Sequence, residues 1–442
     1  MTGLREWCEA APFCPPPPAA ASPFTRADAI PSLDLDRCVP PVSILWLDAE
    51  TVDVLPTYNP GRDVAFNSAG WIALTDLGFV AVTYLDGSDW ILSVRDNQAA
   101  IRGAADPWYR HVVASGAGLA APTVVASGVN LLLVAESSGT VVATYASVLS
   151  PRTVSFTPLV RVTPGTDTGA SRPAACVGPD GIARVVYTAA RDGVFGVYLA
   201  TEFVPGLWLP STVDTSTVDP QFPSIAAGNG ALVVAWRASS GTDDGVYTWA
   251  GAGTVQVVAG QGAPGAELKG SDPSVCVVPD FGLVAGFTVN ITVRGRPDLE
   301  TTFSADGRTW SPNAIVGGAQ SPDLFQAFFQ PASDGSYLAG VWEELDTTAQ
   351  TPTTLAMIAV GCANRAIDGL PAGQPVYVAA NGREGRYPTV AVRAGVVHVA
   401  WIEPRPSSVK NGATETTVRY RQGLLVESTL TIPPSSLPPW PP

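Results

Sequence analysis

Residues 222–236, which read FPSIAAGNGALVVAW, decide the fold of this chain. The stretch joins a proline-led extended run, through a short turn, to small and β-branched residues that end in tryptophan. The same phrase returns from Tyr387-Pro388 to Trp401. A phrase that recurs about every fifty residues indicates a repeat protein, in which each unit buries its faces against its neighbours.

Prolines begin six copies of the phrase, and a seventh, earlier copy lacks the proline and starts near Asp63. The prolines are Pro122, Pro173, Pro223, Pro273, Pro322 and Pro388. We expect the second strand of each copy to end at an aromatic residue that belongs to the core. The predicted ends are Tyr84, Glu136, Tyr187, Trp236, Phe287, Trp342 and Trp401, of which Glu136 breaks the rule.

Two more extended segments follow each copy, and Asp-Gly pairs, which favour tight hairpins, punctuate the chain. Four short strands in about fifty residues describe one blade of a β-propeller. We therefore predict an all-β fold, a propeller of seven four-stranded blades with six as the alternative, and little helix.

The predicted domains are an arm (1–40), linker strands (41–60), the propeller (61–432) and a tail (433–442). Both ends are rich in proline, as in the run Cys14-Pro15-Pro16-Pro17-Pro18. Such stretches are stiff and build no core. We expect residues 1–40 and 433–442 to lie against other subunits of an assembly.

Composition limits the class of partner. The chain has 442 residues, a net charge of −14 and no basic stripe, which argues against a nucleic-acid partner. No apolar run is long enough to span a bilayer, so we expect no membrane insertion. The N-terminus lacks the pattern of a secretory signal, so we expect synthesis in a cytoplasm without export by that route.

The six cysteines divide between the arm and the repeat. Cys8, Cys14 and Cys38 could form one local disulfide and leave a thiol for a partner chain, which makes them anchoring candidates. Cys176 and Cys276 are expected to be small buried side chains, and Cys362 also lies in the repeat. Since no histidine accompanies the arm cysteines, we predict no metal site, and no motif indicates a cofactor.

One hairpin carries a recognisable motif, formed by Ser304, Asp306, Gly307, Thr309 and Trp310. It resembles the Asp-box of sialidase-like propellers. In that family the aspartate caps backbone amides and the tryptophan packs between strands, so the resemblance implies a structural role. It supports a sialidase-like propeller over most of the chain without establishing sialidase activity.

Active sialidases also carry an Arg-x-Pro element in the first blade, three arginines that clamp a carboxylate, a Tyr–Glu pair and an acidic Asp. Arg386-Tyr387-Pro388 has the spacing of that element but falls in the last copy. Arg172 precedes Pro173 directly, one position out of register, and Arg62 is the nearest third candidate. The resemblance implies that Arg386 points into the channel beside two arginines; a salt bridge between blades is the alternative.

Other catalytic signals are weak. The chain has two histidines, of which His398 lies inside a predicted strand, so a histidine-based triad or metal site is not expected. The loops after the second strands of the later copies are longer and more polar, and they share one face. Insertions on one face of a repeat protein often form a binding surface, although drift in tolerant loops is the alternative. The binding-face candidates are Arg237, Asp244, Arg294, Arg296, Glu343, Glu344 and Arg405.

Three functions follow from these observations. The first hypothesis is a non-enzymatic attachment protein of a phage virion, part of a tail, collar or head, anchored by its arm and touching a host-surface glycan. The alternative is a sialidase-type glycoside hydrolase. A lectin-like surface protein is the third reading.

Overall fold

A computed structural model gives the fold of the chain between residues 42 and 427. The described residues are 42–56, 59, 62–65, 70–239, 244–251, 253–259, 269–291, 296–316, 324–346, 354–363, 376–379, 384–404 and 416–427. The predicted arm and tail, with Cys8, Cys14, Cys38 and Pro322, lie outside them. So do the binding-face candidates Arg294 and Arg405.

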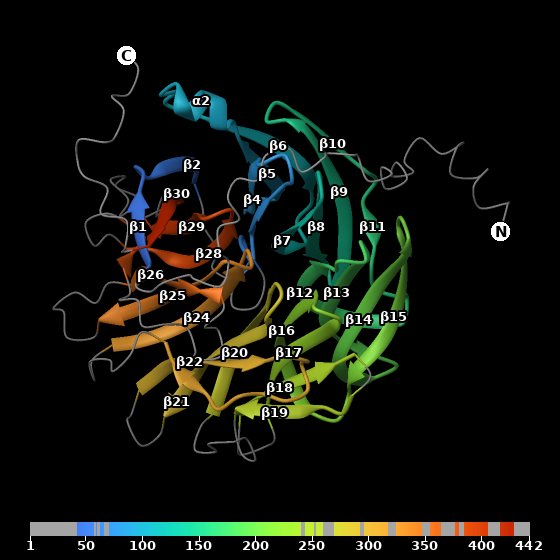
Figure 1. Ribbon diagram of the computed structural model, residues 1–442. Helices are drawn as coiled ribbons and strands as arrows, with labels where there is room; N and C mark the ends of the chain where they lie inside the picture. The colour runs from blue at the N-terminus through green and yellow to red at the C-terminus, as the bar shows by residue number, and fades with distance from the viewer. Residues whose placement is uncertain are drawn as a thin grey trace, which may run out of the picture. The chain divides into compact units, whose positions relative to one another are not determined.

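Seven antiparallel sheets lie around one axis, which makes the chain a seven-bladed propeller (Figure 1). The first three blades contain β3(Ile72–Leu74), β4(Val80–Asp86), β5(Asp89–Arg95) and β6(Trp108–Ser115); β7(Leu119–Ser127), β8(Asn130–Ser137), β9(Thr140–Ser150), β10(Thr153–Phe156) and β11(Val160–Arg161); and β12(Asp167–Val177), β13(Ala183–Arg191), β14(Val194–Val204) and β15(Leu207–Asp214). A short helix, α2(Asn97–Ile101), joins β5 to β6.

The next three blades contain β16(Val218–Gly228), β17(Ala231–Ser239), β18(Asp244–Ala250) and β19(Gln256–Ala259); β20(Lys269–Val278), β21(Gly282–Ile291), β22(Arg296–Ser304) and β23(Ala314–Ile315); and β24(Leu324–Ser333), β25(Tyr337–Asp346), β26(Thr354–Cys362) and β27(Val376–Tyr377). The seventh contains β28(Arg386–Arg393), β29(Val396–Pro404) and β30(Thr416–Glu427), together with β1(Val42–Trp46) and β2(Glu50–Leu55) from the start of the chain.

The ring closes because β1 and β2 both pair with β30, from Val42 opposite Glu427 to Leu55 opposite Thr416. These strands correspond to the predicted linker, but here they complete the last blade. Arg95 of β5 then binds Glu50 of β2 through two hydrogen bonds of 2.9 and 2.5 Å. The first blade is thereby joined to the strands that close the seventh.

The repeated phrase has a structural cause in the innermost strands. In β16, Phe222 and Pro223 together oppose the single residue Trp236, because Gln221 pairs with Arg237 and Ser224 pairs with Ala235. This is a β-bulge, in which two residues face one. Proline fits the second position because it has no N–H that needs a ladder partner. The proline and the aromatic of each phrase are therefore the two sides of one bulge.

Register in the other blades corrects two details of the predicted repeat. In the second blade Ala120 pairs with Glu136, so the residue that opposes the bulge is Ala135, and Glu136 lies one position beyond the aromatic position. In the sixth blade the bulge contains Phe328 and Phe329, which oppose Trp342, so Phe329 stands where the other blades have proline. Pro322 does not mark that bulge.

The core lies between neighbouring blades. Trp236, Phe287, Trp342 and Trp401 are at most 1% exposed. Trp401, for example, packs with Val341 and Ile358 of the sixth blade. His398 is also buried, its Nδ1 lies 2.6 Å from the Tyr420 hydroxyl, and burial lowers its pKa to about 3. Cys176 and Cys276 are free thiols in the inner strands, whereas Cys362 is disulfide-bonded.

We expect Gly286→Ala to destabilise the fold by about 1–3 kcal/mol, the usual cost of overpacking. A methyl group on Gly286 would lie 2.0 Å from Cδ1 of Phe329, the ring at the sixth bulge. Urea unfolding measures the cost. Gly165→Ala is the matched control, because nothing lies within 4 Å of the added carbon. Equal stabilities of the two variants would contradict close packing of these blades.

Candidate active site

The two ends of the channel differ in the chain segments that reach them. Each inner strand begins, and each second strand ends, at the end that carries the bulges, which we call the bulge face. Turns between first and second strands, and between third and fourth strands, lie on the opposite face. The Asp-box turn follows the third strand β22, so it belongs to the opposite face.

The Asp-box residues form a compact turn. The Asp306 carboxylate accepts hydrogen bonds from the backbone N–H groups of Arg308 and Thr309, at 2.8 and 2.9 Å. The Gly307 N–H donates to Ser304 Oγ, and Trp310 packs against two core clusters. These contacts hold the turn to its blade and present no group to the bulge face.

A ring of side chains marks the bulge face. We define the pre-proline ring as the first bulge residue of six inner strands: Ala121, Arg172, Phe222, Asp272, Phe328 and Tyr387. All six have positive φ, between 47° and 61°, a conformation that costs a non-glycine residue about 1–3 kcal/mol. Strain repeated at one level of the channel makes this level the first candidate for function.

Neighbouring members of the pre-proline ring touch across blade boundaries. The Arg172 guanidinium carbon lies 3.8 Å from the centre of the Phe222 ring, and the rings of Phe328 and Tyr387 lie 5.8 Å apart. Asp272 is buried, and Ala121 is small. The ring therefore has charged residues in the third and fifth blades, with Phe222 between them, and aromatic residues in the sixth and seventh.

Glutamates lie directly behind the pre-proline ring in two blades. Glu136 and Glu343 occupy the same register position in β8 and β25, one residue past the position that opposes the bulge. The Tyr387 N–H donates to Glu343 Oε1 at 2.6 Å. Burial raises the pKa of Glu136, against the opposing effects of the Arg172 amide and guanidinium. Arg237 takes the equivalent position in β17.

The pKa of Glu343 is shifted into the neutral range. Burial raises the pKa of Glu343 to about 7, against the opposing effects of the Tyr387 amide and Arg386. Its second oxygen has no hydrogen-bond partner in the described part of the chain. Glu343 can thus hold and release a proton near neutral pH, as a general acid must.

The segment 62–65 lies on the bulge face of the first two blades. The Arg62 carbonyl accepts a hydrogen bond from the Ala121 N–H, and the Asp63 carbonyl accepts one from the Leu85 N–H. Asp63 is 2% exposed, and its Oδ2 accepts the Asn59 N–H at 2.6 Å. Its buried Oδ1 accepts no hydrogen bond from the described residues, and Arg62 Nη1 lies 4.0 Å from it. Burial raises the pKa of Asp63.

The three arginines considered for a carboxylate clamp do not converge. Arg386 binds Glu384, two residues earlier, at 2.8 Å, and its other charged neighbour is Glu343. Arg62 donates to the carbonyls of Leu119 and Gly87. Only Arg172 belongs to the pre-proline ring. The blade-to-blade salt bridge considered for Arg386 is not what the structure shows either, because its partner precedes it in the same segment.

The remaining binding-face candidates divide by environment. Glu343 and Arg237 flank the pre-proline ring, as described above. Glu344 is buried and accepts hydrogen bonds from Gln326 Nε2 at 2.9 Å and Trp342 Nε1 at 3.4 Å, so it serves the blade. Arg296 and Asp244 lie in β22 and β18, but their side chains are outside the described structure.

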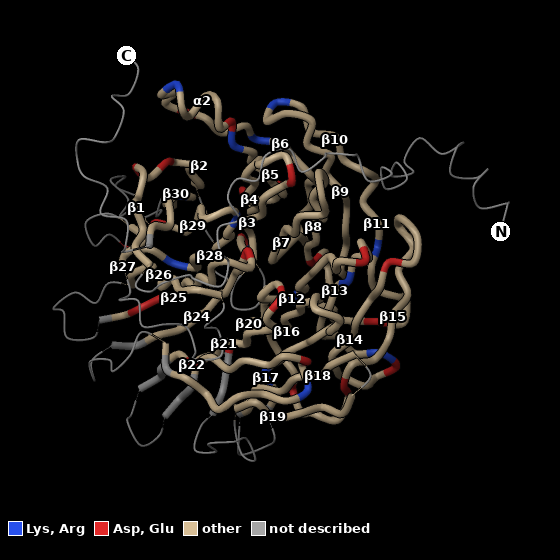
Figure 2. The backbone as a smooth tube through the Cα atoms, viewed as in Figure 1, with Lys and Arg blue, Asp and Glu red and all other residues tan. Residues whose placement is uncertain are grey.

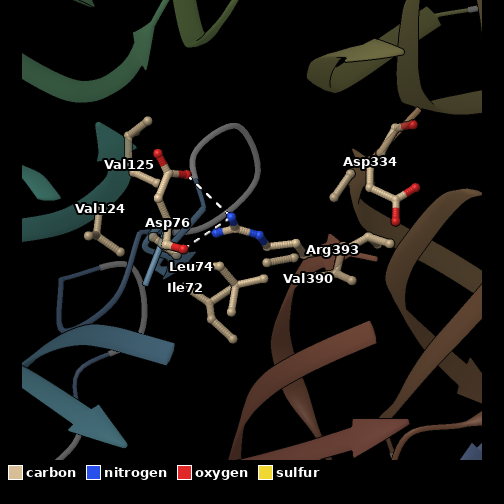
Figure 3. A pocket seen from close by; sticks show the side chains of 14 residues that line it. Ile72, Leu74, Asp76, Val124, Val125, Asp334, Val390 and Arg393 are labelled. Carbon is tan, nitrogen blue, oxygen red and sulfur yellow. Dashed lines mark hydrogen bonds and ion pairs between the residues drawn. The ribbon is translucent and has the colours of Figure 1, made fainter. Parts of the chain in front are cut away.

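A cavity of about 510 Å³ opens at the far ends of the inner strands β3, β7, β24 and β28 (Figure 3). Its walls are mainly aliphatic, and its polar groups already bind protein. Arg393 pairs with Asp76 at 3.5 Å, and Asp334 accepts the N–H groups of Ser336, Tyr337 and Gly395. We read it as a packing feature of the channel.

Two kinds of functional feature are absent from the described residues. They contain no cluster of three or more histidine, cysteine or acidic side chains that could hold a metal ion. No helix among them is long and apolar enough to cross a membrane. Basic side chains are scattered singly over the described blades (Figure 2).

Sequence reasoning missed most of this site. It named Arg172, Glu343 and Arg237, but gave no role to Phe222, Asp272, Phe328, Tyr387 or Asp63. A usable signal was present, because five members of the pre-proline ring directly precede one of the repeat prolines.

The fold has counterparts among solved protein structures. No protein family and no curated protein sequence matches the chain. A solved polysaccharide lyase is 11% identical with a TM-score of 0.46, and the match covers 86% of this chain and 99% of that one. Trypanosoma rangeli sialidase is 15% identical with a TM-score of 0.46, over 85% of this chain and 75% of that one. Penicillium chrysogenum α-L-arabinanase is 11% identical with a TM-score of 0.40, and the match covers 56% of this chain and 92% of that one.

The resemblance to sialidase-like propellers is thus confirmed for the fold. The first hypothesis, a non-enzymatic attachment protein of a phage virion, is wrong by the same comparison: these similar structures are enzymes, and none is a particle component. At such low identity the likeness concerns the fold, so any activity must be argued from the residues of this chain.

Proposed function

We propose that this protein is a glycoside hydrolase whose active site is the bulge face of the channel. The observation that carries the proposal is Glu343, a buried carboxyl with a pKa of about 7 that lies against Tyr387 of the pre-proline ring. A carboxylic acid that keeps its proton near neutral pH is the group that protonates a glycosidic oxygen.

The reaction needs two carboxyl groups. Glu343 donates its proton to the glycosidic oxygen, the bond from that oxygen to the anomeric carbon breaks, and the electron pair stays on the leaving oxygen. A water molecule adds to the anomeric carbon, and its proton passes to a second carboxylate. Asp272 is our candidate for this base, because it belongs to the same ring, one blade before Phe328.

Aromatic side chains supply the binding surface. The faces of Phe328 and Tyr387 offer apolar area to the C–H groups of a sugar ring, and both belong to strained positions held by the bulges. Such preorganised positions orient a substrate without a large cost on binding.

The test is incubation of the purified protein with a panel of plant, bacterial and animal polysaccharides, followed by mass spectrometry. Hydrolysis gives fragments that each carry the elements of water, whereas a lyase gives unsaturated fragments. New saturated ends would support the proposal. Unsaturated ends, or no product from any glycan, would refute it.

A further inference from the structure

The charges around Arg172 bear on the kind of glycan that the bulge face accepts. Burial lowers the pKa of Arg172, the carboxylates of Asp272, Glu136 and Asp219 act to raise it, and the Arg237 guanidinium acts to lower it. The charged groups that act on Arg172 thus include three carboxylates and one further guanidinium. An anionic sugar placed here would meet more negative charge than positive.

The other two arginines considered for a carboxylate clamp, Arg62 and Arg386, are bound to other groups of the protein. Arg62 donates to two backbone carbonyls and lies 4.0 Å from Asp63, and Arg386 pairs with Glu384. Binding a carboxylate firmly usually takes a bidentate guanidinium that is not already balanced by acids. The described arginines of the bulge face do not offer such a group.

Unused hydrogen-bonding atoms point to hydroxyl groups instead. Within the described structure, Arg172 Nη1 and Asp63 Oδ1 are both buried and neither makes a hydrogen bond, although Arg62 Nη1 lies 4.0 Å from Asp63 Oδ1. The first is a donor and the second, when ionised, an acceptor. A sugar hydroxyl can satisfy either atom because it donates and accepts, whereas a carboxylate or sulfate only accepts and would repel Asp63.

We infer that the substrate of the bulge face is an uncharged glycan, built of neutral pentose or hexose units. This inference rests on the proposed hydrolase function and adds the substrate class to it. The aromatic residues of the pre-proline ring pack against the sugar, and the charged residues form hydrogen bonds with its hydroxyl groups.

The experiment compares one polysaccharide in two forms, an acidic glycan and the same glycan after its carboxyl groups are reduced to primary alcohols. We expect kcat/KM for the neutral form to exceed that for the acidic form by at least about tenfold, and added salt to narrow the gap by screening the carboxylates. Neutral arabinans, galactans and glucans extend the panel.

A variant that removes one negative charge near Arg172 tests the electrostatic part of the inference. Asp219 is exposed and its carboxylate acts on Arg172, so Asp219→Asn should raise the ratio of the rate on the acidic form to the rate on the neutral form. Asp180→Asn is the control, because Asp180 lies in the β12–β13 turn on the opposite face. It should change neither rate.

The outcomes are distinct. Equal rates on both forms, or faster cleavage of the acidic form, would overturn the neutral-substrate inference and leave the hydrolase proposal standing. Absence of cleavage of any glycan, neutral or acidic, would overturn the hydrolase proposal and the inference with it.

Discussion

Replacing Glu343 with glutamine is expected to lower the rate of glycan hydrolysis by about 10²–10⁴-fold, the usual contribution of a general acid. Glutamine keeps an oxygen that can accept the Tyr387 N–H but has no proton to give. The propeller should therefore remain folded while the chemical step slows. Initial rates on the substrate found in the panel, with circular dichroism as the check of folding, measure this effect.

The same carboxyl predicts the direction of the pH dependence. Burial raises the pKa of Glu343 from its ordinary value of 4.5 to about 7, so the acid form is lost as pH rises through about 7. Activity should fall over that interval in the wild-type protein. Because the folded pKa is the higher one, the stability that Glu343 contributes is present below pH 4.5 and is lost as pH rises to about 7. Glu343→Gln should remove this loss of stability between pH 4.5 and about 7.

Glu344 provides the matched control. It adjoins Glu343 and is similarly buried, but its carboxylate binds Gln326 and Trp342. Glu344→Gln should leave the rate within a few-fold of wild type even if it lowers stability. If Glu343→Gln were as active as wild type, or if both variants lost activity equally, the role given to Glu343 would be wrong.

Replacing Arg95 with alanine is expected to lower the free energy of unfolding by about 3 kcal/mol, the low end of the cost of removing one partner from a buried ion pair. Arg95 is 7% exposed and binds both oxygens of Glu50, which also accepts a hydrogen bond from Trp108 Nε1. Without Arg95 the Glu50 carboxylate keeps the indole partner but loses its countercharge. The contact joins the first blade to the closing strands, so its loss weakens the closure of the ring.

Urea unfolding of Arg95→Ala beside Arg184→Ala tests this prediction. Arg184 pairs with Asp180 at 2.6 Å, but Asp180 is 44% exposed, so that pair should contribute only about 0–1 kcal/mol. Closely similar losses in the two variants would show that the Arg95–Glu50 contact does not stabilise ring closure.

The architecture could be predicted from sequence because it depends on short-range patterns. Residues 222–236 contain both strands of one hairpin and both sides of one bulge, so the proline and the aromatic recur together in the sequence. Where another residue takes the proline position, as Phe329 does, the same reasoning chose a wrong marker.

Ring closure could not be read in this way. The pairing of Val42 with Glu427 joins the two ends of the described chain, and nothing near either strand specifies its partner. Strands 42–55 have ordinary extended patterns that suit a linker as well as a blade.

The site was predicted in part for the same reason. Loop length and charge led to Glu343 and Arg237, because such features are visible locally. The neighbours of Arg172 come from several blades, and the raised pKa of Glu343 depends on burial between β25 and β28. Three-dimensional contacts of this kind leave no local trace in the chain.

The most direct test of the account is the position of a bound oligosaccharide in a crystal structure of the Glu343→Gln variant. We predict that the sugar contacts the pre-proline ring, with Phe328, Tyr387 and Arg172 against it and the residue at 343 within reach of a glycosidic oxygen. A sugar bound instead in the cavity beside Arg393 and Asp76, with the pre-proline ring unoccupied, would contradict it.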